Sequence, residues 1–218
     1  METRLGEFER LLVSWPGLVS ARARNEVTDL VRDSLALLDH LGGAVSVVDV
    51  GSGGGMPGIP LQLARPDLRV TLLESDRRKA AFLVHAAASL DLTVEVVAER
   101  AEDAGRGRLR EAFDVAVCRA LGPMPVVAEL CLPLVRTGGR LLAMAGQVDP
   151  FGEAARLVGG GEPEVLAAPT GARSSGRVIA VPKVAPTPDR YPRRAGVPQR
   201  RPLTPGGPTQ PPSETPPG

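Results

Sequence analysis

Apolar side chains in the first 42 residues recur at the spacing of amphipathic helices. Pro16 and Gly17 separate two such sets, because a Pro-Gly pair breaks a helix and favours a turn. The two sets are Leu5, Phe8, Leu11 and Leu12, and then Val27, Leu30, Val31, Ser34, Leu35 and Leu38. We therefore predict an N-terminal helical segment over residues 1–42.

From residue 43 the pattern changes to short apolar runs that alternate with helical spacing. The runs at 45–50, 69–74, 93–97, 113–118 and 139–144 indicate strands, and 164–168 and 177–181 indicate two more, as a hairpin. Helices are expected at 59–64, 77–90 and 124–135. Strands that are apolar on both faces and alternate with helices are typical of parallel sheets. The pattern predicts a doubly wound, mostly parallel, seven-stranded α/β domain over residues 43–183.

The C-terminal part is rich in proline and consists of two segments, of which the first is basic. Residues 183–203 hold six basic side chains against one acidic side chain, and we interpret 184–203 as a basic extension. Residues 204–218 contain little that could form a core, which predicts a disordered tail.

Composition excludes several classes of protein. A net charge of +1 excludes a uniformly basic nucleic-acid coat, although it allows a local basic face. The two cysteines cannot form a disulfide framework or a four-ligand zinc site, and we expect no metal. Neither a signal peptide nor an apolar run long enough to span a membrane is evident, so we expect a cytoplasmic monomer.

A glycine-rich loop directly after the first core strand is the sharpest local signal. In doubly wound sheets such a loop approaches the ligand, and Gly51, Gly53 and Gly55 would supply clearance and unusual dihedral angles. The dinucleotide fingerprint G-x-G-x-x-G fits only a frame that starts three residues beyond the strand. The acid before the loop, Asp49, suits a ligand with an ammonium group better than a pyrophosphate.

An acidic residue closes the next strand. The carboxylate of Glu74, 23 residues after Gly51, can accept hydrogen bonds from both hydroxyls of an adenosine ribose. Together with the loop, this residue is typical of S-adenosylmethionine-dependent methyltransferases with a Rossmann-like fold. The residues alone leave the methyl acceptor open.

Longer strings resemble one family, the bacterial 16S ribosomal RNA guanine-N7 methyltransferases, also called the glucose-inhibited division protein B family. The most distinctive is DVGSGGGMPGIPL at 49–61. Others are TLLES at 71–75, ERAE at 99–102, FD at 113–114 with CRA at 118–120, GQ at 146–147, and YPRRAGVP at 191–198. The resemblance spans roughly residues 25 to 203.

The resemblance implies further cofactor contacts. They fall on Gly51 and Met56 in the loop, on Ala101 and Glu102 beside the adenine, and on Arg119 at the end of the fourth strand. For Arg119, contact with the methionine carboxylate, contact with an RNA phosphate, a role in positioning and a structural ion pair all remain open.

The implied substrate is a guanine of 16S rRNA, either naked or in the 30S particle. Guanine N7 has a free lone pair, so its methylation requires in-line placement and exclusion of water rather than a general base, and no catalytic residue is assigned. The basic extension is the candidate phosphate-binding surface. Its candidate RNA-binding residues are Arg190, Arg193, Arg194, Arg200 and Arg201.

Three other hypotheses stay open at this point. One is a methyltransferase for a small molecule or a protein, and another is a nicotinamide-dependent reductase. The third is a non-catalytic RNA-binding assembly factor, motivated by Leu30 and Ala145, which replace the histidine and lysine usual in the family strings.

Overall fold

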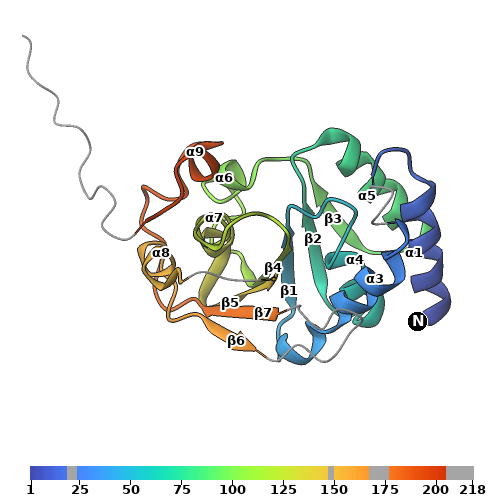
Figure 1. Ribbon diagram of the computed structural model, residues 1–218, viewed down its shortest axis with the longest axis horizontal. Coiled ribbons are helices and arrows are strands. Elements are labelled where there is room, and N and C mark those ends of the chain that lie inside the picture. Colours follow the sequence, from blue (N-terminus) through green and yellow to red (C-terminus); the bar gives the residue numbers. More distant parts are fainter. Residues whose placement is uncertain (19–23, 147–149, 167–176, 205–218) are drawn as a thin grey trace, which may run out of the picture.

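The computed structural model describes residues 1–18, 24–146, 150–166 and 177–204. In this part of the chain a single seven-stranded sheet has the order β3-β2-β1-β4-β5-β7-β6 (Figure 1). The strands are β1 (Ser46–Val50), β2 (Arg69–Leu73), β3 (Val94–Val97), β4 (Phe113–Arg119), β5 (Val135–Ala145), β6 (Glu164–Leu166) and β7 (Arg177–Pro182).

The first five strands in sequence, β1 to β5, run parallel, and β7 pairs antiparallel with both β5 and β6. Val48 of β1 lies between Thr71 of β2 and Ala116 of β4, so β1 is the centre from which the two halves of the sheet extend. The predicted doubly wound, mostly parallel sheet of seven strands is confirmed.

Helices cover both faces of the sheet, as Figure 1 shows. Helices α1, α3, α4 and α5 lie on one face, and α6, α7, α8 and α9 lie on the other. The helices are α1 (Glu2–Ser14), α3 (Val27–Leu35), α4 (Gly58–Ala64), α5 (Arg77–Ser89), α6 (Ala101–Ala104), α7 (Met124–Cys131), α8 (Gly152–Leu157) and α9 (Val197–Arg200), with 3-10 turns η1 (Leu38–His40) and η2 (Leu132–Leu134).

Each face of the sheet has its own apolar core. Val48 and Val50 of β1 point into the core beneath α7, whereas Val47 points into the core beneath α1, α3 and α4. This alternation follows from the two-residue period of a strand, and burial on both faces explains why the strand sequence is apolar throughout.

Some boundaries differ from the sequence prediction. The helix expected at 124–135 ends at Cys131, because Pro133 lacks the N–H that a helix interior requires, and η2 leads directly into an eleven-residue β5. The short helices α6, α8 and α9 lack a long apolar period and were not predicted. The end of the predicted strand 164–168 lies outside the described residues.

Residues 184–203, called here the C-terminal strap, pack against the domain. Tyr191 and Leu203 belong to the core beneath α7 and are only 7% and 8% exposed. The predicted tail lies outside the described residues apart from Thr204. Among the described residues, no helix combines the length and the apolar character needed to cross a membrane.

Candidate cofactor site

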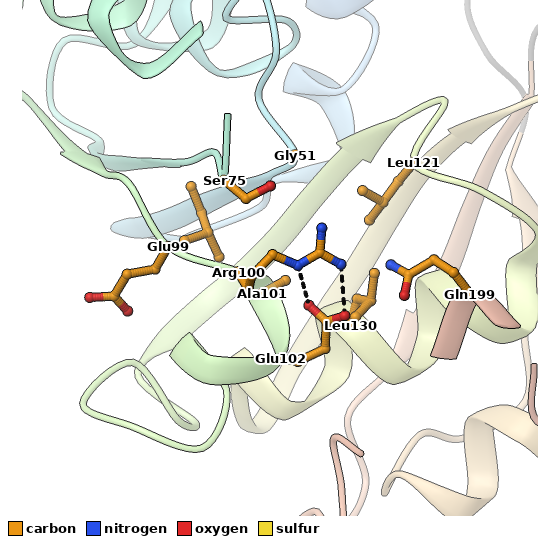
Figure 2. A pocket seen from close by; sticks show the side chains of 10 residues that line it. Gly51, Ser75, Glu99, Arg100, Ala101, Glu102, Leu121, Leu130 and Gln199 are labelled. Carbon is orange, nitrogen blue, oxygen red and sulfur yellow. Dashed lines mark hydrogen bonds and ion pairs between the residues drawn. The ribbon is translucent and has the colours of Figure 1, made fainter. Parts of the chain in front are cut away.

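A pocket lies at the carboxyl ends of the parallel strands, next to the point where the strand order switches between β1 and β4 (Figure 2). The chain leaves these two strands in opposite directions, and such a switch point separates their loops and opens a crevice. The pocket is lined by Gly51, Leu73, Ser75, Glu99, Arg100, Ala101, Glu102, Leu121, Leu130 and Gln199.

The glycine loop follows β1 with a backbone that other residues rarely adopt. Gly51, Gly53 and Gly55 have φ angles of +70°, +54° and +85°. A Cβ on Gly51 would lie 2.6 Å from the tip of the Leu121 side chain, and the positive φ of Gly51 is itself a conformation that favours glycine. A Cβ on Gly55 would meet Ile59 at 2.5 Å, which gives Gly55 a packing role inside the loop.

The carboxylate of Glu74 holds the loop from the end of β2. Its Oε2 accepts the Gly53 N–H at 2.9 Å, and its Oε1 accepts the Asp76 N–H at 2.8 Å. The residue is 7% exposed. Each carboxylate oxygen can accept a second hydrogen bond, so this donor set fits the two hydroxyls of a ribose without losing its loop contacts.

Asp49 lies beneath the loop. Its side chain is fully buried, and Oδ2 accepts the Gly58 N–H at 2.9 Å, while Oδ1 has no hydrogen-bond partner among the described residues. Burial raises the pKa of Asp49 to about 7, although the Gly58 hydrogen bond opposes the shift. The residue therefore supports the loop through Gly58, and its interpretation as a partner for a ligand ammonium group stays a prediction.

A charged pair forms the polar edge of the pocket. Arg100 donates to both oxygens of Glu102, at 3.2 Å from Nε and 2.8 Å from Nη2 (Figure 2). Glu102 is fully buried, and its Oε1 also accepts the Gly196 N–H of the strap at 2.8 Å. Burial alone would raise the pKa of Glu102, but Arg100 and Gly196 hold it below its usual value. Ala101 lies between these side chains in the pocket wall.

The N-terminal helix supports the glycine loop from outside. A Cβ on Gly54 would lie 2.9 Å from the Leu12 side chain of α1, so α1 packs directly on the loop backbone. Met56 is half-buried against the same apolar core. Met56 is not among the residues that line the pocket in the described part of the chain.

Arg119 joins β4 to α3. Its guanidinium donates to the Leu30 carbonyl at 2.7 Å and lies 3.4 Å from the Asp33 carboxylate. Its side chain is 17% exposed. The sequence left several alternatives open for Arg119. The contacts with Leu30 and Asp33 are those expected of the structural ion pair.

The basic residues of the strap differ in their surroundings, since some side chains are exposed and one is held in an ion pair. Arg190, Arg194, Arg200 and Arg201 are exposed. Arg193 is half-buried and bonded to Glu129 through its backbone N–H and two guanidinium nitrogens, at 2.9, 2.8 and 2.6 Å. The interpretation of Arg193 as a phosphate-binding residue is therefore replaced by that of a structural ion pair.

Some pocket residues gave no sequence signal. Leu121 follows β4 in an irregular loop, and Gln199 lies about 150 residues from Gly51 in sequence. Only the folded chain brings them together. Ser75 and Glu99 follow the strand ends β2 and β3, and a strand-end rule could have identified them.

A family model described as GidB, rRNA small subunit methyltransferase G, matches residues 3–153, which is more than half of the chain. The protein belongs to this family. The membership expected from the DVGSGGGMPGIPL string and its companions is thus confirmed.

Relatives in the rRNA small subunit methyltransferase G family match most of the chain. The ribosomal RNA small subunit methyltransferase G of Moorella thermoacetica is 42% identical over 188 residues, which is 83% of this chain and 78% of that protein. Its counterpart in Rubrobacter xylanophilus is 44% identical, over 80% of this chain and 71% of that protein.

A solved structure supports the fold. The S-adenosylmethionine-dependent methyltransferase SibL, in its apo form, superposes with a TM-score of 0.62 over 82% of this chain and 62% of that chain, at 17% identity. The predicted Rossmann-like methyltransferase fold is confirmed.

Proposed function

We propose that this protein transfers a methyl group from S-adenosylmethionine to N7 of a guanine in 16S ribosomal RNA. Family membership supports methyl transfer to small-subunit rRNA. The observation that carries the cofactor assignment is the pocket at the switch point, which is lined by Gly51 of the loop and by Leu73 and Ser75 on either side of Glu74.

The residues that would hold the cofactor fit its parts. Glu74 has hydrogen-bonding capacity for the ribose hydroxyls, and the backbone at Gly51 and Gly53 allows close approach of the methionine part. Ala101 and Leu130 offer apolar walls for a flat adenine ring. When bound, the sulfonium of S-adenosylmethionine supplies an electrophilic methyl group.

The protein's own contribution is placement and exclusion of water. Guanine N7 attacks with its lone pair, so no side chain has to remove a proton first. His85 stacks near Trp15 at 5.3 Å between ring centroids, and His40 lies in η1, so neither histidine lines the pocket. Leu121 and Leu130 border the pocket with apolar side chains, which would help to exclude water once the ligands are bound.

The exposed arginines of the strap are the proposed phosphate contacts. Arg200 and Arg201 are neighbours in sequence of Gln199, which lines the pocket, so they place positive charge beside the cofactor site. Arg190 and Arg194 extend this charge along the strap. RNA held here would lie with its phosphates near the pocket opening.

Replacing Arg200 and Arg201 with serine tests this surface. We expect weaker binding of 16S rRNA and a log–log salt slope that is shallower by about one unit or slightly less for each phosphate that the variant no longer neutralises. Arg108 and Arg156, exposed elsewhere, provide the matched control pair. Unchanged RNA affinity in the Arg200 and Arg201 variant, measured across a salt series, would remove this surface from the proposal.

The function itself is tested in cells and in vitro. Chemical cleavage at N7-methylguanine should map one modified base in 16S rRNA of cells that have this gene, and the site should be unmodified in cells that lack it. Tritiated methyl transfer to naked 16S rRNA, 30S particles and total protein identifies the acceptor. Calorimetry with S-adenosylmethionine and with NAD separates an active methyltransferase from a non-catalytic fold or a reductase.

A further inference from the structure

Helix α5 opens with three consecutive cations, called here the α5 basic cluster (Arg77, Arg78 and Lys79). Arg77 and Arg78 are exposed, and Lys79 is half-buried. In the described part of the chain none of these three side chains has a hydrogen-bond or ion-pair partner, unlike Arg193, which binds Glu129. The dipole of a helix favours acidic rather than basic side chains in its first turn, so the cluster does not serve the stability of α5.

The backbone end of α5 is already capped, which leaves the side chains as the available donors. Asp76 Oδ1 accepts the N–H groups of Arg78 and Lys79 at 2.8 and 3.3 Å. The Arg78 guanidinium extends toward the turn after α1, since a Cβ on Gly17 would lie 3.9 Å from its Nη2 atom. Guanidinium and ammonium groups that lack a protein acceptor are well suited to bind phosphate oxygens.

The α5 basic cluster lies beside the pocket. Ser75, which lines the pocket, precedes the cluster in the loop between β2 and α5. On the other side Gln199 lines the same pocket and is followed by Arg200 and Arg201, which are exposed. Helices α5 and α9 lie on opposite faces of the sheet (Figure 1). The pocket therefore lies between two groups of cations, one from each face.

Both groups of cations are anchored by buried contacts. The α5 basic cluster belongs to a 13-residue helix whose Phe82 is fully buried in the core. In the strap, the Gly196 N–H donates to the buried Glu102 carboxylate at 2.8 Å, and Arg193 is bound to α7. An RNA strand that binds both groups would be held at two points, with the pocket between them.

We propose that the α5 basic cluster is a second phosphate-binding surface, and that the substrate RNA strand crosses the pocket from the strap to α5. The chain as a whole has a net charge of only +1, so attraction to RNA depends on where its cations gather. Phosphate contacts fix the register of a bound strand, and two contacts on either side of a nucleotide restrict its position more than one contact does. This inference rests on the proposed methyl transfer to RNA.

The first test removes two charges from the cluster and two from the opposite edge of the sheet. The test variant is Arg77→Ser with Arg78→Ser. The control is Arg69→Ser with Arg140→Ser, which removes equal charge from exposed positions toward the amino ends of the parallel strands. Binding is measured across a salt series with the RNA that accepts methyl groups, either naked 16S rRNA or the 30S particle. Thermal unfolding and calorimetry with S-adenosylmethionine check that fold and cofactor binding are retained.

We expect the affinity of the Arg77 and Arg78 variant for RNA to fall about tenfold or more at about 0.1 M salt. Its log–log salt slope should be shallower by about 1.4–1.8 units, which is about 0.7–0.9 for each lost phosphate contact. The control should bind RNA like the wild-type protein. An affinity and a slope equal to those of the control would overturn the inference. If the wild-type protein transfers no methyl group to RNA, the proposed function itself fails.

The second test asks whether the RNA crosses the pocket. Arg77→Cys and Arg201→Cys each receive a photoactivated cross-linker, and both native cysteines are buried and therefore protected from it. We expect cross-links from the two positions on opposite sides, along the strand, of the guanine that is methylated. Cross-links from both positions to the same side of that guanine, or none from residue 77, would overturn the inference.

Discussion

The ion pair between Arg193 and Glu129 gives a sharp prediction about stability. The Glu129 carboxylate is fully buried in α7, and two guanidinium nitrogens of Arg193 bind its two oxygens at 2.8 and 2.6 Å. Replacing Arg193 with alanine removes both bonds and leaves only the backbone N–H of residue 193, at 2.9 Å, as a partner from the strap. The perturbation thus strands a buried negative charge.

The expected cost follows from that stranded charge. Removing one partner of a buried ion pair costs about 3–5 kcal/mol, because the remaining ion keeps its desolvation penalty without its counter-charge. Arg194 is adjacent and exposed, and its replacement with alanine should change the free energy of unfolding by no more than about 0.5 kcal/mol. Adding Glu129→Gln to the Arg193→Ala variant should restore part of the loss, since the buried charge is then absent.

Urea unfolding followed by circular dichroism measures these differences. The free energy of unfolding of Arg193→Ala should fall well below that of the wild-type protein and of Arg194→Ala. A loss below about 1 kcal/mol would refute the assignment of Arg193 as a buried structural partner and would return it to the candidate RNA-binding residues.

Three further predictions concern the loop and the sheet. Because the pKa of Asp49 is raised to about 7, the folded state holds a proton that the unfolded state releases, so stability should fall as pH rises from about 4 to about 7. Asp49→Asn should abolish that decline in urea unfolding across this range. Glu74→Gln should weaken S-adenosylmethionine binding in calorimetry at least about tenfold, because an amide replaces a charged acceptor; unaltered affinity would contradict the ribose assignment. Burial would raise the pKa of Asp114, but the Val45 N–H and Arg136 hold it well below its usual range. The Asp114 carboxylate should therefore stabilise the folded state above about pH 4, and this contribution to the free energy of unfolding should be lost in acid. Asp114→Asn should flatten the acid side of a plot of that free energy, measured by urea unfolding, against pH.

Sequence reasoning located the sheet and its loop because both depend on local pattern. The apolar run at β1 and the glycines that follow it are contiguous, and Glu74 lies at a strand end, where topology places ligands. The helix end at Cys131 does not follow from the apolar spacing, because the apolar run continues past Pro133, where proline ends the helix.

The roles of the strap residues depend on contacts across the chain. The sequence shows Arg193 and Arg194 as equivalent cations, and only the position of Glu129 separates them. Gln199 lies in a Pro-rich segment with no period, so nothing local indicates that it reaches the pocket. Long-range pairing of charges is the information that a single sequence does not contain.

The packing of Leu12 on Gly54 has a consequence for synthesis of the protein. During translation α1 emerges before the glycine loop and can support that loop as soon as it appears. Gln199 emerges about 150 residues after Gly51, so the pocket lacks one wall until nearly all of the described chain has left the ribosome. A growing chain therefore cannot form the complete cofactor site before Gln199 has emerged.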